Sequence, residues 1–506
     1  MGIPVSLFST MVIKFLYSQF INCWFFLPSI LLFFPAQMFL SQDLRFKEAV
    51  ELAQSGKLSE AEKLVRSALG DQPSPDGYRF LGYLCESQEN LEQAEKAYQK
   101  SLQLNPELEF SKIRLGIVYC KRKNYSECFD MLKPLEDRVS EIPEALYYLC
   151  EALLAKGDRS CAIRVARIME RIGEVDPEAL LSISRLFMAQ NLYQESIPLL
   201  NKSVAGLPRS AEAHYLLSLA LFQTSKIESM RPLLQKALVL APDSVPALLL
   251  QAMSLLELNR LAEAKKTVQR VLEIQPENPK AAYLLGKVRI EQGNYSEAIE
   301  GLTALIQRFS MDPDVHLLLL SAYRNEENYQ KAFDYSLMLA GLFPNHPLVL
   351  YNAGLDLEIL GRFQEGESYL RKTVALAEND LKLSVGAKLG LARVLTKQEK
   401  YTEAVPLFEE AIRGNQGGPS ARQDLSDIYF KTGEYEKALK LLREVVTLEP
   451  KKKEAYIRLA KVLRRLGENE EARKQVKIFQ QLEKLEKERL EKEPSKQNVR
   501  PSKESR

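Results

Sequence analysis

The chain has 506 residues, of which 46% are hydrophobic and 27% are charged, and its formal net charge is +2 at pH 7. Because 69 Lys and Arg residues nearly balance 67 Asp and Glu residues, the overall charge gives no reason to expect a nucleic-acid partner. A chain of this length would ordinarily form about three domains, but an internal repeat argues for one continuous array instead.

The first 40 residues differ in kind from the rest of the chain. They carry no charge apart from Lys14, and 20–34 (FINCWFFLPSILLFF) is an apolar run with one Asn and one Pro. We interpret 1–41 as a signal peptide or a membrane anchor. The segment has no small-x-small cleavage site, so the retained anchor stays open, as does a leader that is buried or wrongly assigned. Both main interpretations predict an exported protein of the periplasm or cell envelope, with membrane contact only through this segment if it is uncleaved.

A spacing of 34 residues dominates the sequence after this leader. A mostly small residue recurs at that spacing from Ala94 to Gly366, and the series resumes at Ala404 after a slip of four residues. A fixed period of this size is the signature of a solenoid built from stacked units. We number each unit from position 1 to position 34, with Pro75 as position 1 of the type unit. The array then comprises thirteen units: 42–74, nine units of 34 residues that fill 75–380, and 385–418, 419–452 and 453–486.

Each unit has the pattern of two antiparallel amphipathic helices. Positions 8 and 20 hold small residues, with Leu320 and Met230 as the exceptions, and small side chains allow two helices to cross closely. Apolar positions 4, 7, 8 and 11 form one helical stripe, and positions 20, 24 and 27 form another. A Gly such as Gly293 or Gly433 marks the turn between the helices, and Pro at position 32 ends the second helix in many units.

Two stretches of the repeat carry a family resemblance. Residues 78–106 (YRFLGYLCESQENLEQAEKAYQKSLQLNP) and 283–307 (YLLGKVRIEQGNYSEAIEGLTALIQ) closely resemble the tetratricopeptide repeat, and the resemblance extends over 42–486. It implies an all-α fold: a right-handed α-solenoid superhelix of about thirteen helix-turn-helix units. A fold of this kind does not by itself identify a function.

Two segments depart from the period. Residues 381–384 (LKLS) fall between two units, which predicts a longer loop or helix end, with a hinge as the alternative. The sequence becomes highly charged towards the end, and we interpret 487–506 as the end of a charged capping helix followed by a disordered tail.

The sequence contains no arrangement that indicates catalysis. His214 and His316 occupy a packing position of their units, and His346 lies in a turn. No metal-ligand spacing, phosphate-binding glycine loop or nucleophile motif is present in the sequence. We therefore predict a protein that is not an enzyme and that has no cofactor and no metal.

Five of the six cysteines fall in three consecutive units: Cys85, Cys120, Cys128, Cys150 and Cys161. Two of these, Cys128 and Cys150, fill the small-residue positions, and free Cys behaves as a small buried hydrophobic residue. We expect mostly free, buried thiols. Export would permit disulfides, but the spacing selects no pairing.

The resemblance implies a concave groove lined by positions 2, 5, 6, 9, 12 and 13 of the first helices. In this chain Tyr and Leu alternate at position 5 over eight units, and positions 6, 9 and 12 are mostly apolar in the middle of the array. The residues that we predict to bind a protein or peptide in the groove are Tyr147, Leu181, Tyr215, Leu216, Leu219, Phe222, Leu249, Leu250, Met253, Tyr283, Leu284, Leu317 and Tyr351. The alternative is that these residues pack between neighbouring units.

These patterns together favour a non-enzymatic protein-interaction scaffold in the cell envelope. The alternative function is an adaptor that handles lipid or glycan, or that assists secretion assembly, together with an enzymatic partner. Both interpretations use the groove, and they differ in what fills it.

Overall fold

The computed structural model describes residues 44–136, 142–171, 176–308, 312–378, 380–414 and 417–492, with side chains to 488. The predictions for the leader at 1–41 and for the tail after 492 lie outside the described residues. Among the described residues, no helix has the length and apolar character that crossing a membrane requires.

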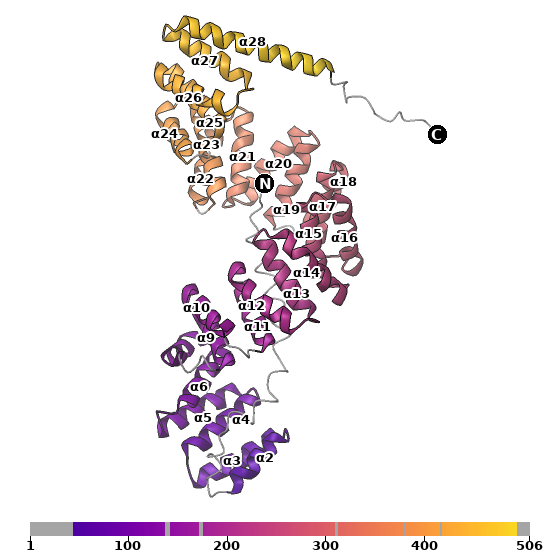
Figure 1. Cartoon of the computed structure of the whole chain (residues 1–506), viewed down its shortest axis with the longest axis vertical. Helices are drawn as coiled ribbons and strands as arrows, with labels where there is room; N and C mark the ends of the chain where they lie inside the picture. Colours follow the sequence, from indigo (N-terminus) through magenta and orange to yellow (C-terminus); the bar gives the residue numbers. More distant parts are fainter. Residues whose placement is uncertain are drawn as a thin grey trace, which may run out of the picture. The chain divides into compact units, whose positions relative to one another are not determined.

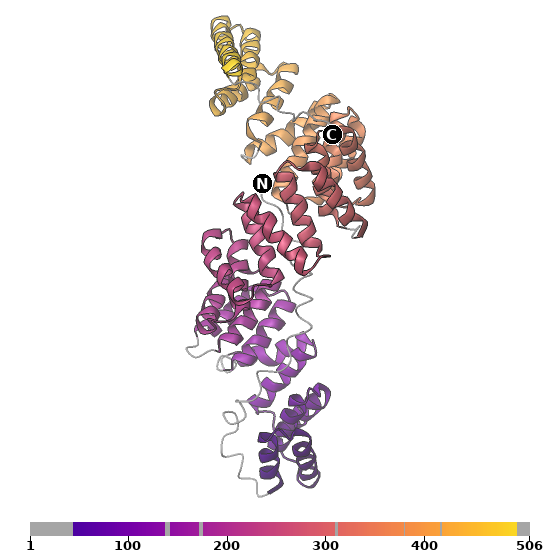
Figure 2. The same cartoon turned by 90° about the vertical axis from the view of Figure 1, so that its right-hand side faces the viewer.

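The described residues form 26 α-helices and one short 3-10 helix, and they contain no β-strand (Figures 1 and 2). The α-helices follow one another as thirteen antiparallel pairs, which confirms the predicted all-α repeat fold. Contacts within the chain divide it into two compact units, unit one (1–276) and unit two (277–506), and each is described by itself.

Unit one holds seven helix pairs, in which the first helix precedes the second along the chain. The pairs are α2 (Leu44–Gln54) with α3 (Leu58–Asp71), α4 (Pro75–Ser87) with α5 (Leu91–Leu104), α6 (Glu109–Lys121) with α7 (Tyr125–Leu132) and the 3-10 helix η3 (Lys133–Leu135), α9 (Pro143–Ala155) with α10 (Arg159–Arg171), α11 (Pro177–Ala189) with α12 (Tyr193–Gly206), α13 (Ala211–Gln223) with α14 (Ile227–Leu240), and α15 (Val245–Glu257) with α16 (Leu261–Ile274).

Unit two holds six helix pairs of the same kind. They are α17 (Pro279–Glu291) with α18 (Tyr295–Arg308), α19 (Pro313–Asn325) with α20 (Tyr329–Leu342), α21 (Pro347–Ile359) with α22 (Phe363–Leu376), α23 (Leu381–Lys397) with α24 (Tyr401–Arg413), α25 (Gly418–Lys431) with α26 (Tyr435–Leu448), and α27 (Lys453–Arg465) with α28 (Asn469–Lys492).

The small residues at position 8 mark where paired helices approach most closely. A Cβ atom added at Gly82 would lie 2.6 Å from the ring of Tyr98, and one added at Gly116 would lie 2.8 Å from Leu132. Both partner residues occupy position 24, so position 8 faces position 24 across the pair. At these two glycines a larger side chain would push the helices apart, because interaxial distance follows the side chains at the contact. Where position 8 is Leu320, position 24 is the small residue Ser336, and both are buried.

The turns inside the pairs share one backbone feature. Each of the thirteen described turns contains one residue with positive φ at the same place in the repeat. Six of these residues are Gly, among them the predicted turn residues Gly293 and Gly433. The other seven are Glu89, Lys123, Asn191, Ser225, Asn259, Glu327 and Glu399. The helix-pair geometry therefore imposes a left-handed backbone conformation even where no Gly is available.

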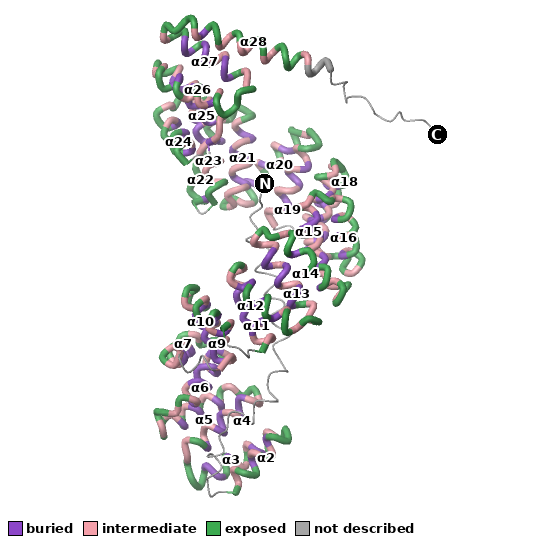
Figure 3. Tube along the Cα trace, viewed as in Figure 1, coloured by how far each residue is buried: buried purple, intermediate pink, exposed green. Residues whose placement is uncertain are grey.

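The four residues 381–384 form the first turn of α23, so they lengthen a helix and do not form a loop. Helix α23 has 17 residues, whereas α21 has 13, and the side chain of Asp380 caps it by accepting a hydrogen bond from the Leu383 amide. The buried residues recur in every helix pair, whereas the final part of α28 is mostly exposed (Figure 3).

Candidate partner-binding face

The first helices of neighbouring pairs touch one another within each unit. In unit one, contacts join α4 to α6, α6 to α9, α9 to α11, α11 to α13 and α13 to α15. In unit two, α17 contacts α19, α21 contacts α23, and α23 contacts α25. We call the surface that these helices share the first-helix face. The predicted groove residues all lie on first helices.

A network of charged residues occupies the first-helix face of α4, α6 and α9. We call Glu86, Arg114, Lys121 and Glu144 the charged stretch. The Arg114 guanidinium donates to both carboxylate oxygens of Glu86, at 2.5 and 3.0 Å, and to Glu144 Oε2 at 2.7 Å. Lys121 Nζ lies 2.6 Å from Glu86 Oε1, and the Tyr98 hydroxyl donates to Glu86 Oε2 at 3.1 Å. These bonds connect three successive pairs.

Burial and the neighbouring charges shift the pKa values of Glu86 and Arg114 in opposite directions. The Glu86 side chain is only 1% exposed, and burial alone would raise its pKa. The charges of Arg114 and Lys121 outweigh burial and hold the pKa of Glu86 below its ordinary value of 4.5. Burial would lower the pKa of Arg114, but Glu86 and Glu144 raise it well above its ordinary value. Glu86 and Arg114 therefore form an ionised pair. Together with Lys121 and Glu144 they make ion pairs that join neighbouring helix pairs.

The first-helix face of α13 and α15 has the opposite chemistry. We call Tyr215, Leu216, Leu219, Phe222, Leu249 and Met253 the apolar stretch, and all six are half-buried. Helix α13 (AEAHYLLSLALFQ) is apolar nearly all round. Its other side supplies the buried residues that pack on the array, including Leu217 and Ala220. A helix that is apolar on all sides needs cover on all sides, and the described residues cover one side of α13 more completely than the other.

The thirteen predicted groove residues divide by burial. Leu181, Leu250 and Leu284 are buried, with 1%, 3% and 7% of their surface exposed, so they offer a partner almost no contact area. The other ten are half-buried. Eight of these ten also pack against a core cluster. They are Tyr147, Tyr283, Leu317 and Tyr351, and Tyr215, Leu216, Leu219 and Phe222 of the apolar stretch. Packing between neighbouring helix pairs therefore accounts for part of the predicted set of groove residues.

Unit two carries ion pairs on its first-helix face that the sequence analysis did not identify as pairs. Arg324 on α19 donates to both carboxylate oxygens of Asp356 on α21, at 2.8 and 2.7 Å. Arg393 on α23 donates to Glu358 on α21 at 3.0 and 3.1 Å. Arg458 on α27 lies 3.2 Å from Asp427 on α25. The two charges of each pair lie about one repeat apart in the sequence, and that spacing places them on adjacent first helices. This spacing could have predicted the ion pairs.

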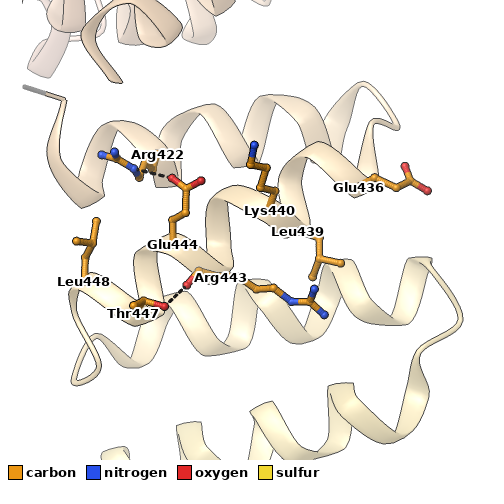
Figure 4. A pocket seen from close by; sticks show the side chains of 8 residues that line it. All are labelled: Arg422, Glu436, Leu439, Lys440, Arg443, Glu444, Thr447 and Leu448. Carbon is orange, nitrogen blue, oxygen red and sulfur yellow. Dashed lines mark hydrogen bonds and ion pairs between the residues drawn. The ribbon is translucent and has the colours of Figure 1, made fainter. Parts of the chain in front are cut away.

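A surface pocket of about 550 Å³ lies on α25 and α26 (Figure 4). Its lining residues are Arg422, Glu436, Leu439, Lys440, Arg443, Glu444, Thr447 and Leu448. The Arg422 guanidinium is bonded to Glu444 at 3.0 Å, and the Thr447 hydroxyl donates to the Arg443 carbonyl at 2.8 Å. One side of the pocket is therefore closed by an ion pair between the two helices.

The histidines and cysteines occupy structural positions. His214 and His316 are buried, and the His346 ring accepts a hydrogen bond from the Val349 amide at the start of α21. Cys85, Cys120, Cys128 and Cys150 are buried free thiols, and Cys161 is half-buried. Within the described part of the chain, no group of three or more His, Cys, Asp or Glu residues could hold a metal ion.

Comparisons with known proteins give one consistent similarity. Two family models described as tetratricopeptide repeat match the sequence, one at 256–323, 395–446 and 433–478, the other at 46–109 and 351–419. A model described as anaphase-promoting complex, cyclosome, subunit 3 matches 189–271. No curated protein matches the sequence of this chain.

Similar solved structures include two helical proteins. Yeast Tom70 is 15% identical, with 86% of this chain and 96% of that chain covered and a TM-score of 0.41. A chain of the APC/C hetero-tetramer Cut9-Hcn1 is 12% identical, with 82% of this chain and 95% of that chain covered and a TM-score of 0.42.

Proposed function

Because the chain belongs to the tetratricopeptide repeat proteins, we propose that it is a non-enzymatic scaffold that binds a protein partner on the first-helix face of unit one. The observation that carries this proposal is the apolar stretch. Large apolar side chains on two adjacent helices are only half-buried there and keep part of their surface accessible, although the rest of each helix is well packed. Contiguous exposed apolar surface commonly marks an interaction site, and repeat arrays bind through extended surfaces of this kind.

The chemistry of the apolar stretch favours the apolar side of a peptide segment. An amphipathic helix or an extended segment would place its apolar side chains against Leu219, Phe222 and Met253. Tyr215 supplies a large rigid ring together with a hydroxyl that can bond to a peptide backbone. The charged stretch contributes less to partner binding, because its ion pairs already satisfy one another.

A matched pair of double variants tests the proposal. Leu219→Ala with Phe222→Ala reduces the apolar stretch, whereas Val239→Ala with Leu240→Ala removes apolar surface from α14 of the same helix pair. Val239 and Leu240 are 73% and 38% exposed. We expect the first variant to bind the partner about 30-fold more weakly, as for a loss of about 2 kcal/mol at an interface centre. The control variant should bind as the wild type does.

The measurement is partner capture by the full chain from its native cells, followed by affinity measurement with the captured partner. Equal binding by both variants would exclude the apolar stretch as the site. If the first variant unfolds, a photo-crosslinking residue at position 222 of an otherwise unaltered chain gives an independent answer. A crosslink to lipid or glycan and not to protein would favour the adaptor function described above.

We also propose that the scaffold acts in the cell envelope, delivered by its apolar leader. The support is the composition of 1–41, which is uncharged apart from Lys14 up to the start of the repeat. Membrane contact would then occur only through this segment, if it is uncleaved. Cell fractionation combined with N-terminal sequencing tests the location, and a cytoplasmic product that still begins at Met1 or Met11 would exclude it.

A further inference from the structure

Two cysteines face each other in the pair formed by α6 and α7. Gly116 at position 8 lies against Leu132 at position 24, which fixes how the two antiparallel helices align. Four residues further along α6 is Cys120, and four residues back along α7 is Cys128. The alignment that joins Gly116 to Leu132 therefore also places Cys120 opposite Cys128, close to the turn that connects the helices.

The hydrogen bonds of the two thiols agree with this alignment. The Sγ atoms of Cys120 and Cys128 lie 3.3 and 3.9 Å from the same acceptor, the carbonyl oxygen of Tyr148 on α9. Both thiols are buried. The Cys128 thiol also interacts directly with Cys120, and this interaction, followed by burial, raises the pKa of the Cys120 thiol.

The other described cysteines have separate surroundings. Cys150 donates to the Ala162 carbonyl at 3.5 Å, and Cys85 lies 3.8 Å from Arg66. Cys161 lies 3.7 Å from Arg164. Within the described residues, Cys120 and Cys128 are thus the two whose thiols converge on one atom. Sequence spacing alone selected no pairing.

We propose that Cys120 and Cys128 form an intramolecular disulfide that closes the α6–α7 pair when the protein meets a disulfide oxidant. The two thiols lose two protons and two electrons as the new S–S bond forms. The oxidant is a small-molecule or protein disulfide, which accepts the electrons and protons and is reduced to two thiols. The bond would fasten α7 to α6 at the turn.

The disulfide would hold the shortest α-helix described in unit one. Helix α7 has 8 residues, whereas α5, α10 and α12 have 13 or 14. The chain leaves the α-helix after Leu132 and enters a 3-10 helix that contains Pro134. A covalent link at the turn would limit opening of this pair.

Burial determines when the bond can form. Thiol–disulfide exchange requires a thiolate, and the raised pKa of Cys120 keeps its thiolate fraction low in the folded array. We therefore expect slow oxidation of the folded protein and fast oxidation during folding, before the pair has closed. A chain that folds in an oxidising compartment would then acquire the bond.

The experiment uses the full chain, unfolded and refolded in a buffer of reduced and oxidised glutathione, then alkylated and digested with trypsin. Lys121, Arg122 and Lys123 separate the two cysteines, so cleavage yields two peptides that only a disulfide can hold together. We expect the Cys120–Cys128 peptide pair in most oxidised molecules. The pair should persist in Cys85→Ser and disappear in Cys128→Ser.

Two results would overturn the proposal. One is recovery of Cys120 and Cys128 as separately alkylated peptides at every glutathione ratio at which the chain refolds. The other is a mixture of disulfides with no preference for this pair. The wild-type peptide map decides between these outcomes even if a variant fails to fold, and a higher melting temperature for the oxidised chain would show that the bond braces the array.

Discussion

The charged stretch and the apolar stretch lie on the same face of unit one and use the same repeat positions in different ways. In the charged stretch, Glu86 at position 12 of one first helix binds Arg114 at position 6 of the next. In the apolar stretch, position 12 of α13 is Phe222, and the stretch continues on α15 with Leu249 at position 5 and Met253 at position 9. Charges at these positions join successive helices, whereas the apolar residues there are half-buried and form the surface that we propose for partner binding.

In unit two, ion pairs likewise join successive first helices. Its pairs Arg324–Asp356, Arg393–Glu358 and Arg458–Asp427 each join two successive first helices. The packing positions inside the helix pairs hardly differ between the charged and apolar regions, since position 8 stays small in both. The proposed partner binding would therefore use positions other than position 8, which packs each pair internally, so the two can be altered separately.

We expect the largest loss of stability when the central carboxylate of the charged stretch, Glu86, is neutralised. Glu86→Gln leaves Arg114 and Lys121, whose side chains are 10% and 18% exposed, without their main counter-charge. Removing one member of a buried ion pair typically costs about 3–5 kcal/mol. We expect a loss of that size in the stability of α4 to α9, measured by hydrogen exchange of their backbone amides, with partner binding on α13 and α15 unchanged.

The matched control for this variant is Glu263→Gln on α16. Glu263 pairs with Arg260 at the surface, and the two side chains are 55% and 41% exposed. Exposed pairs contribute about 0.2–1 kcal/mol, so this substitution should be nearly neutral. Equal effects of Glu86→Gln and Glu263→Gln would show that the charged stretch does not hold the first helices together.

The second prediction concerns a double variant that places charges in the apolar stretch. Phe222→Glu with Met253→Arg places opposite charges at positions 12 and 9 of successive first helices, as in the Glu358–Arg393 pair of unit two. We expect each single variant to be less stable than the wild type. The double variant should recover about 0.5–3 kcal/mol relative to the sum of the two, because the new charges interact.

Partner binding by this double variant is the second measurement, after its stability. The double variant should lose partner capture although its fold is partly restored, because its charges satisfy each other and the apolar surface is gone. Thermal unfolding of the four proteins completes the cycle. Strictly additive stabilities, or retained capture by the double variant, would contradict the division of roles between the two stretches.

The third and smaller effect is a pH dependence of the stability that Glu86 contributes. Burial opposes ionisation of Glu86, but Arg114 and Lys121 hold its pKa below the unfolded value of 4.5. Its contribution to stability is therefore present above pH 4.5 and is lost as the pH falls through the folded pKa. The stability difference between wild type and Glu86→Gln should shrink on acidification. A difference that stays constant from pH 7 to strongly acidic conditions would contradict the shift.

The period of the repeat was sufficient to predict thirteen helix pairs and the close contact at position 8. It did not predict that Glu89, Lys123 and Glu327 would adopt positive φ, because their residue type gives no such signal and the helix pairing imposes the conformation. Nor did it predict the division of the chain between Pro276 and Glu277, since the spacing continues through that point.

The candidate face was predicted less completely than the fold. The alternation at position 5 identified Tyr215 and Leu249, which are half-buried on first helices of the array. The burial of Leu250 and Leu284 was not predicted, because it depends on how neighbouring pairs cover position 6. The ion pairs were missed for the same reason: charge is visible in one sequence, but the contact between two helices requires their relative placement.

The smallest expected effect concerns the hydroxyl of Tyr215, which distinguishes packing from binding within the apolar stretch. Burial, with a smaller contribution from Tyr193, raises the pKa of Tyr215 to about 12. The group therefore contributes stability that is present below its unfolded value of 10.0 and is lost between pH 10 and about 12. Tyr215→Phe keeps the ring, so at pH 7 it should change stability by no more than about 1 kcal/mol.

Two measurements on Tyr215→Phe complete the comparison. In alkaline absorbance titration the variant should lack one phenol that ionises near pH 12, and it should lose less stability than the wild type between pH 10 and 12. If the hydroxyl bonds to the partner's backbone, binding at pH 7 should weaken by roughly 2- to 10-fold, since one hydrogen bond contributes about 0.5–1.5 kcal/mol. Unchanged binding together with the altered titration would mean that Tyr215 acts only in packing, and that the partner contacts its neighbours through apolar surface alone.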